Sequence, residues 1–270
     1  MLYYFILFLI ILAIIIWGAV TKWKFIKRKR KDGYDNKKKL TIYFPYYNRP
    51  DYLQKQLENY SKMSPEIKDK ITLFIVDDGS MKSPAVDVIK NFKGKLHIIL
   101  YRINIDIPWN AAEANNLAFS KVQTDYVFRT DIDIMFLEDD LNKLFNIDLK
   151  KGIFYTFNRR HPDCKKSIGS PPNIYLIHKD DYWKTNGYNE YFSGSYGDDI
   201  EFLPRLNKKV KKKYINYIYC IQFHGAGTPP EANLDRSLKI NTAKLNEKNT
   251  PHLIFQHKDK YQFLKELNLK

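Results

Sequence analysis

Short apolar runs alternate with stretches of helical character from Leu40 onward, and this alternation restricts the possible folds more than any other feature of the sequence. Runs of strand length occupy residues 40–44, 71–76, 95–101 and 125–130, and the helical stretches between them include 84–92 and 109–122. Strands separated by helices of about 10 to 15 residues form βαβ units, whose parallel sheet is covered by helices on both faces. The sequence therefore predicts an α/β fold built on a mostly parallel, Rossmann-like sheet.

Acidic residues directly follow two of these apolar runs. Asp77-Asp78-Gly79-Ser80 ends the run at 71–76, and Asp131-Ile132-Asp133 follows the run at 125–130. Ligands of open parallel sheets bind beyond the carboxyl ends of the strands, so we expect these carboxylates at a ligand site. Two short carboxylates in an Asp-x-Asp suit a hard divalent cation that is shared with a diphosphate. The same residue types are also typical of turns and helix N-termini, and that alternative stays open for each group.

The second half of the chain is less regular. Strand-like runs occupy 152–157 and 173–178, a short helix is predicted over 179–186, and a long β run at 214–223 leads into His224. Gly187 is a normal stop for the short helix. Beyond Gly225 the chain is rich in Asn and Lys and contains one amphipathic segment, at 261–267. We therefore interpret residues 226–270 as a C-terminal tail.

The N-terminus reads as a membrane anchor. Residues 2–20 contain no charged side chain, and about 20 apolar residues are enough to cross a bilayer as a helix. A cleaved signal peptide needs a basic segment before a shorter apolar core, and neither is present here. The sequence therefore predicts a transmembrane anchor at residues 1–21.

A strongly basic segment follows the predicted anchor. Residues 22–39 hold ten basic and two acidic side chains, in a chain whose formal net charge is +15. Next to an anchor, such a segment is typical of a juxtamembrane stem on anionic lipid headgroups. The positive-inside rule then places the following domain in the cytoplasm of a single-pass membrane protein. A nucleic-acid-binding arm is the competing interpretation, but no groove-reading motif follows the segment.

Four stretches, in a fixed order, carry a family resemblance: TIYFPYYNRPDYLQKQL, LFIVDDGS, IPWNAAEANNLAFSKVQTDYVFRTDID and WKTNGYNEYFSGSYGDDIEFLPRL. They resemble the first strand and nucleotide-binding loop, the second strand, the DxD region and the acceptor-side signature of family 2 glycosyltransferases of the GT-A fold. The acceptor-side motif is similar to that of galactosyltransferases. The resemblance covers residues 40–225 and implies a GT-A glycosyltransferase domain there.

On the donor side, the resemblance implies contacts with the nucleotide of a nucleoside-diphosphate sugar. The residues concerned are Pro45, Tyr46, Asn48, Asp78 and Asp131. Within the DxD it implies that Asp133 is the direct metal ligand and that Asp131 lies nearer the ribose. His224 matches a histidine that completes the metal site in several relatives.

On the acceptor side, Asp199 matches the acid that serves as catalytic base in inverting members. The pair here is Asp-Asp where the family has Glu-Asp, so Asp198 remains an alternative base. Trp183 and Tyr196 are candidate platforms for sugar stacking, and Gly197 and Asp198 are further acceptor-side candidates.

Two other departures from the family pattern stand out. Ala114-Asn115-Asn116 replaces the usual Ala-Arg-Asn, and Pro204 stands inside the helix that follows the acidic pair. Proline removes a helical hydrogen bond, so we expect it to shorten that helix.

The predicted function is metal-assisted, inverting transfer of a sugar, with a UDP-sugar as donor and Mn²⁺ or Mg²⁺ as cofactor. The acceptor is a glycan, lipid or protein that the sequence does not identify, and no specific nucleic-acid binding is expected. Golgi members of the resembled family have the opposite orientation, which makes the Golgi or ER lumen the alternative location. A catalytically silent binding module and a membrane-tethered nucleic-acid-binding protein are the alternative functions.

Overall fold

The computed structural model describes residues 39–107, 110–162, 167–171, 173–195, 197–223 and 261–268. Several predicted features lie outside these ranges, namely the anchor at 1–21, nearly all of the basic stem, Tyr196, His224 and most of the C-terminal tail. Within the described ranges, no helix is both long enough and apolar enough to cross a bilayer.

The described residues form one nine-stranded mixed sheet with the strand order β5-β8-β6-β7-β4-β1-β2-β3-β9. At its centre β4, β1, β2 and β3 are parallel, as the alternation of strands and helices predicts. The strands are β1 (Leu40–Tyr46), β2 (Ile71–Asp78), β3 (His97–Ile103), β4 (Tyr126–Arg129), β5 (Ile134–Phe136), β6 (Ile153–Arg160), β7 (Tyr175–His178), β8 (Lys211–Gln222) and β9 (Tyr261–Asn268).

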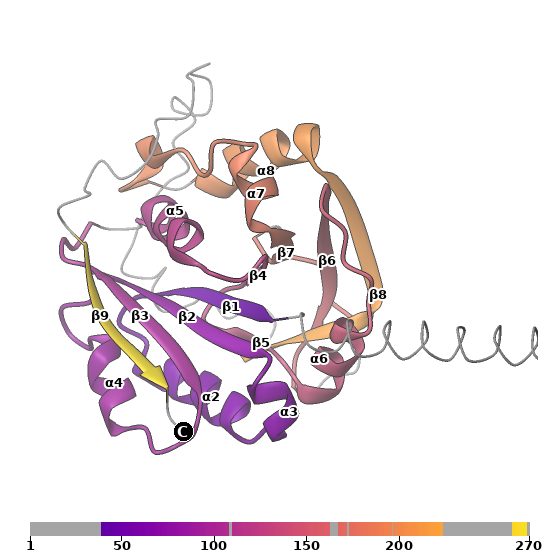
Figure 1. Ribbon diagram of the computed structural model, residues 1–270. Helices are drawn as coiled ribbons and strands as arrows, with labels where there is room; N and C mark the ends of the chain where they lie inside the picture. The colour runs from indigo at the N-terminus through magenta and orange to yellow at the C-terminus, as the bar shows by residue number, and fades with distance from the viewer. Residues whose placement is uncertain are drawn as a thin grey trace, which may run out of the picture. The chain divides into compact units, whose positions relative to one another are not determined.

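Helices cover both faces of the sheet (Figure 1). On one face lie α2 (Pro50–Ser61), α3 (Pro65–Lys68), α4 (Ala85–Asn91) and α6 (Glu138–Phe145). On the other face lie α5 (Ala111–Lys121), α7 (Lys179–Trp183) and α8 (Asp198–Lys209), with the short 3₁₀ helix η1 (Glu190–Phe192) before α8. The acceptor-side signature and the helix before the DxD strand therefore share one face of the sheet.

The alternation of side chains along the central strands produces two separate cores. On β1, Ile42 and Phe44 pack under α2 and α4, whereas Tyr43 between them packs under α5. All eight residues of β2 are buried, which explains why its sequence is a continuous apolar run. Each large apolar side chain buried in this way contributes about 1.5–3 kcal/mol to folding. The carboxyl ends of these strands are thereby fixed in place.

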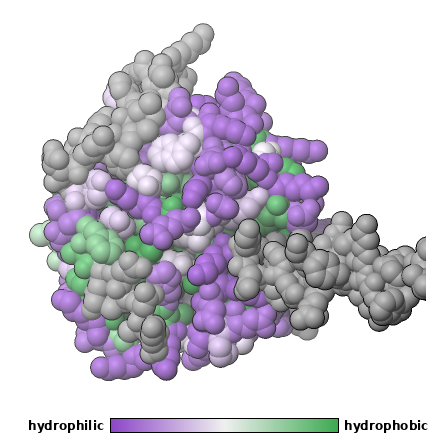
Figure 2. Space-filling view, in the orientation of Figure 1, coloured by the Kyte–Doolittle hydropathy of each residue, from purple (hydrophilic) through white to green (hydrophobic). Residues whose placement is uncertain are grey.

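Strand β9 comes from the segment that the sequence predicts as a C-terminal tail. It pairs antiparallel with β3 and completes that edge of the sheet. Phe263 of β9 packs against Tyr101 of β3, with 5.1 Å between ring centroids, yet half of its surface remains exposed. Figure 2 shows a small apolar patch over this strand on a largely hydrophilic face.

Helix α8 runs through Pro204 and is not shortened by it, contrary to expectation. Pro204 lies on the exposed side of the helix, as does Ile200, whose carbonyl loses its helical donor. Water can satisfy that carbonyl, which lowers the cost of an internal proline. The inner side, with Phe202 and Leu206, packs into the core.

Candidate active site

The two acids that end β2 have different tasks. Asp77 accepts hydrogen bonds from the backbone N–H groups of Ser80 and Ala85, each at 2.8 Å. It therefore closes the turn and supports the start of α4. Burial raises the pKa of the Asp77 carboxyl, and these hydrogen bonds partly offset that effect. For this residue the turn-and-cap interpretation is the one that the geometry supports.

Asp78 points instead toward the start of α5. Its Oδ2 accepts a hydrogen bond from the Asn110 N–H at 3.2 Å, and its side chain is buried. Gly79 follows with φ +72°, and a Cβ at that position would overlap the carbonyl oxygen of Ile105. Only glycine fits this turn, so the backbone holds Asp78 beyond the carboxyl end of β2.

The first loop uses two of its predicted nucleotide-binding side chains to hold the second loop. The Tyr46 hydroxyl donates to the Ser83 carbonyl, and the side chain is fully buried. Asn48 Oδ1 accepts from the N–H groups of Lys82 and Ser83. The Tyr46 side chain thus supports the loop, and Pro45 is half-buried near the end of β1. The nucleotide contacts expected of these residues stay predictions.

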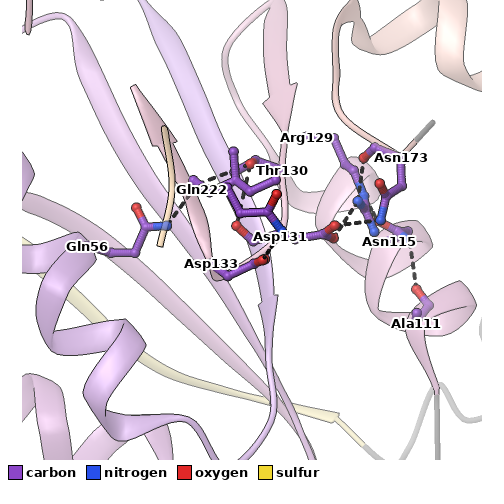
Figure 3. A network of polar contacts seen from close by, with 10 residues as sticks. Gln56, Ala111, Asn115, Arg129, Thr130, Asp131, Asp133, Asn173 and Gln222 are labelled. Carbon is purple, nitrogen blue, oxygen red and sulfur yellow. Dashed lines mark hydrogen bonds and ion pairs between the residues drawn. The ribbon is translucent and has the colours of Figure 1, made fainter. Parts of the chain in front are cut away.

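Asp131 is held from two sides by other residues of the chain (Figure 3). Arg129 Nη1 donates to Asp131 Oδ1 at 2.7 Å, and Asn173 Nδ2 donates to Oδ2 at 2.5 Å. Arg129 is 3% exposed and also donates to the carbonyl of Asn173. Burial raises the pKa of the Asp131 carboxyl, although the Arg129 guanidinium acts in the opposite direction. The first acid of the DxD is therefore charge-compensated within the protein.

Asp133 has a different environment. Its Oδ2 accepts a hydrogen bond from the neutral amide of Gln222 at 3.2 Å, and Arg159 in turn donates to Gln222 Oε1 at 3.1 Å. The loop itself is held by Gln56 of α2, whose Nε2 donates to the carbonyls of Ile132 and Ile134. This anchoring fixes the position of Asp133 at a half-exposed site next to β8.

A divalent cation fits Asp133 better than Asp131. The Arg129 guanidinium beside Asp131 opposes a second positive charge, whereas an uncharged amide reaches Asp133. Across the part of the chain that the structure describes, no group of three or more His, Cys, Asp and Glu is arranged to hold a metal. A hard cation can take its other ligands from water and a bound diphosphate, so one protein carboxylate is compatible with such a site.

Electrostatic effects on buried tyrosines connect these acids with α8. Burial raises the pKa of Tyr43 well above its ordinary value, and both Asp78 and Asp131 add to the shift. Burial raises the pKa of Tyr175 to about 12, and Asp198 and Asp131 add to that shift. Acids from β2, the DxD and α8 therefore act on the same pair of buried tyrosines, Tyr43 and Tyr175.

The start of α8 separates the two candidate bases. Gly197 precedes the helix with φ +116°, a conformation that favours glycine. Asp198 is 5% exposed and faces the buried tyrosines, whereas Asp199 is half-exposed, with its Oδ1 accepting from the Ile200 N–H. Of the two, Asp199 is the carboxylate that an acceptor can reach from solvent.

Trp183 connects two helices. Its indole nitrogen donates to the Phe119 carbonyl at 3.3 Å, and its ring packs edge-on against Tyr182. The half-buried indole thus ties α7 to the end of α5, and its role as a sugar platform stays a prediction.

Three partners of the DxD were missed by sequence reasoning. Gln56, Asn173 and Gln222 are distant in sequence, and nothing in their local pattern indicates the role. Arg129 did leave a signal, because a charged residue inside the apolar run of β4 needs a buried partner.

Replacing Arg129 by methionine is expected to destabilise the protein by about 3 kcal/mol, since a partly buried Asp131 loses its counter-charge. Arg160→Met is the matched control, because the Arg160 guanidinium lies over the Tyr219 ring and should cost less than about 1 kcal/mol. Urea unfolding monitored by circular dichroism measures both. Equal losses for the two variants would contradict a special role for the Arg129–Asp131 pair.

The fold and the site together define a class. A sheet that is covered on both faces, with acids at the carboxyl ends of its parallel strands, is typical of open α/β folds, whose ligands bind at that edge. The sequence profile of glycosyl transferase family 2 matches residues 41–200, more than half of the chain. The chain belongs to this glycosyltransferase family.

Comparison with solved structures finds the GT-A fold. *S. aureus* TarS 1–349 in complex with UDP-GlcNAc superposes with a TM-score of 0.56 at 12% identity, over 70% of this chain and 60% of that one. The mannosyltransferase PcManGT from Pyrobaculum calidifontis, in complex with GDP-Man and Mn²⁺, gives 0.53 at 14% identity, over 71% and 59%. The chain thus spans about 60% of the length of the TarS fragment. No curated protein sequence matches the chain.

Proposed function

We propose that this protein transfers a sugar from a nucleoside-diphosphate sugar to an acceptor hydroxyl, with inversion at the anomeric carbon. The observation that carries the proposal is the placement of Asp78 and the DxD at the same edge of the parallel sheet, where Asn110 contacts Asp78 and Asn115 of α5 contacts Arg129, the partner of Asp131. Membership of glycosyl transferase family 2 supports the same reaction class.

Each acid has a distinct role in this proposal. Asp78 binds the base of the donor nucleotide, and Asp131, held by Arg129 and Asn173, accepts hydrogen bonds from the ribose. Asp133 holds a divalent cation, Mn²⁺ or Mg²⁺, which when bound neutralises charge on the leaving diphosphate. Asp199 takes the proton of the acceptor hydroxyl as that oxygen attacks the anomeric carbon.

The donor is proposed to be a UDP-sugar. TarS structures in complex with UDP-GlcNAc and with UDP support a uridine nucleotide, whereas the PcManGT complex holds GDP-Man. The test is thermal denaturation of the full chain in detergent with UDP, GDP and their sugars, with and without Mn²⁺. We expect metal-dependent stabilisation by uridine nucleotides and release of UDP on addition of acceptor extracts.

Two results would contradict the proposal. Stabilisation by guanosine nucleotides alone would overturn the choice of donor. Nucleotide binding without sugar transfer or donor hydrolysis, under any of the conditions, would indicate a binding module in place of an enzyme.

We further propose that residues 1–21 anchor the protein and that the catalytic domain lies in the cytoplasm, on the basis of charge asymmetry in the sequence. The sequon Asn59-Tyr60-Ser61 is a poor reporter of topology, since Asn59 lies in α2 and its Nδ2 donates to the carbonyl of Phe136 in β5. A cysteine introduced at exposed position 208, in a Cys164→Ser background that keeps only the buried Cys220, is the better reporter. Protection of Lys208→Cys from an impermeant maleimide in intact cells is expected, and labelling would reverse the assignment.

A further inference from the structure

Asn116 of α5 uses every hydrogen-bonding position of its side-chain amide. Oδ1 accepts from the Tyr188 N–H at 2.9 Å and from the Tyr182 hydroxyl at 2.5 Å. Nδ2 donates to the Tyr188 carbonyl at 2.9 Å and to Glu190 Oε1 at 2.8 Å. A primary amide offers two donors and two acceptor lone pairs, so this fully buried group is completely satisfied. The Asn116 side chain thereby binds both the N–H and the carbonyl of Tyr188.

The segment that Asn116 grips is a tight turn at residues 185–188. Gly187 has φ +72°, and a Cβ there would overlap Asn116 Oδ1. The opposite side of the turn is held by Arg205 of α8, which donates to the carbonyls of Thr185 and Gly187. Glu201, one helical turn earlier, pairs with Arg205 and fixes its orientation. The turn is therefore clamped between α5 and the helix that starts at the proposed base.

Helix α5 is also connected to the acids on the donor side of the site. Asn115 Oδ1, adjacent in sequence to Asn116, accepts from Arg129 Nε at 3.1 Å, and Arg129 pairs with Asp131 (Figure 3). Asn115 Nδ2 donates to the Ala111 carbonyl at 2.8 Å, which orients the amide. The Asn110 N–H, just before α5, donates to Asp78. Helix α5 and its N-cap are therefore connected to Asp78 directly, to Asp131 through Arg129, and to α8 through the turn.

We propose that Asn116 is a positioning residue that sets the place of Asp199 relative to the bound donor. The inference rests on the proposed function. Transfer requires the acceptor oxygen, the base and the anomeric carbon in one geometry, and a displacement of about 1 Å can cost 10²-fold in rate. The path Asn116, turn 185–188, Arg205 and α8 is made of buried or half-buried hydrogen bonds throughout. A change at Asn116 should therefore affect the transfer step more than donor binding.

A purely structural role makes a different prediction. If Asn116 only stabilises the fold, its loss lowers the melting temperature but leaves turnover by the folded protein unchanged. Tyr155 offers a matched control, because it is a buried tyrosine whose hydroxyl accepts a hydrogen bond from the Lys150 N–H, just before β6. That hydroxyl lies at the opposite end of its strand from Arg159, the residue that contacts Gln222 beside the DxD.

The experiment compares Asn116→Asp, Tyr182→Phe and Arg205→Lys with the control Tyr155→Phe, all in the full chain. Asn116→Asp is nearly isosteric but cannot donate to Tyr188 and places a carboxylate against Glu190. Tyr182→Phe removes one hydroxyl hydrogen bond, and Arg205→Lys removes the Nη1 contacts with the two turn carbonyls while keeping the charge. If Asn116→Asp does not fold, the two milder variants, Tyr182→Phe and Arg205→Lys, test the proposal in its place. Readouts are kcat, donor KM, melting temperature and hydrogen exchange of residues 193–203.

We expect kcat to fall about 10-fold or more for Asn116→Asp and Arg205→Lys, with donor KM within about threefold of wild type. Hydrogen exchange of 193–203 should increase in the same variants and stay unchanged in Tyr155→Phe. In an Asp199→Asn background the additional loss in kcat should largely disappear, because both changes act on the same step.

Unchanged kcat in folded Tyr182→Phe and Arg205→Lys, or full additivity with Asp199→Asn, would overturn the positioning role. The proposed function fails separately, if wild type shows no transfer with any donor. In that event the hydrogen exchange still decides whether Asn116 controls the start of α8, and unchanged exchange in the variants would reject that control.

Discussion

Asparagine in place of Asp199 is expected to slow sugar transfer by about 10²-fold or more, which is the usual contribution of a general base. Asparagine keeps the size of the side chain and its ability to accept from the Ile200 N–H, but it cannot take a proton. Donor affinity and metal dependence should therefore stay near wild type, so the loss should appear in kcat. Initial rates at varied donor and acceptor concentrations separate these terms.

Asp198→Asn is the matched comparison, because it makes the same chemical change one residue away. Asp198 is buried beside Tyr175, whereas Asp199 is half-exposed, so the change at Asp198 should reduce kcat less. Equal losses at both positions would leave the base unassigned between them. Transfer at the wild-type rate by Asp199→Asn would rule out Asp199 as the base.

The second large effect is expected at Asp133. Alanine at this position should abolish Mn²⁺-dependent binding of the donor while leaving the fold intact, because the contact with Gln222 lies at a half-exposed site. Isothermal titration with UDP in the presence and absence of Mn²⁺ measures the effect, and far-UV circular dichroism checks the fold. Asp139→Ala, which removes an exposed acid of α6, is the control for lost negative charge.

Asp131→Asn should behave differently from Asp133→Ala. It leaves the buried Arg129 without its counter-ion, so stability should fall by about 3 kcal/mol and the donor should bind less well even without metal.

One result would contradict the prediction for Asp133. If Asp133→Ala still binds the donor with an unchanged Mn²⁺ requirement, the DxD is a turn and not a metal site.

The sequence indicates where the acids lie, but not which contacts each acid makes. Asp77 and Asp78 are adjacent and chemically identical, and β2 places them on opposite sides of the strand. One then caps the turn at Ser80, and the other meets the start of α5. Similarly, Asp198 and Asp199 differ in exposure because successive helical residues point about 100° apart. Neither distinction has a signature in the local sequence.

The environments of other side chains come from distant segments. The polar atoms of Tyr46 and Trp183, two predicted ligand contacts, donate to the carbonyls of Ser83 and Phe119. Strand β9 was assigned to the tail because pairing with β3 across more than 150 residues of chain leaves no local pattern.

The sequence by itself determined the α/β class, the order of the central strands and helices, and the acids at the strand ends. Hydrophobic periodicity and turn residues are local properties, so they can be read from neighbours along the chain. Only the tertiary structure decided that Arg129 and Asn173 compensate Asp131, and that Asn116 joins α5 to the turn before α8. Apart from the local Arg129–Asp131 pair, these contacts join polar groups that are 40 or more residues apart, and the low-dielectric interior makes each such group require its partner.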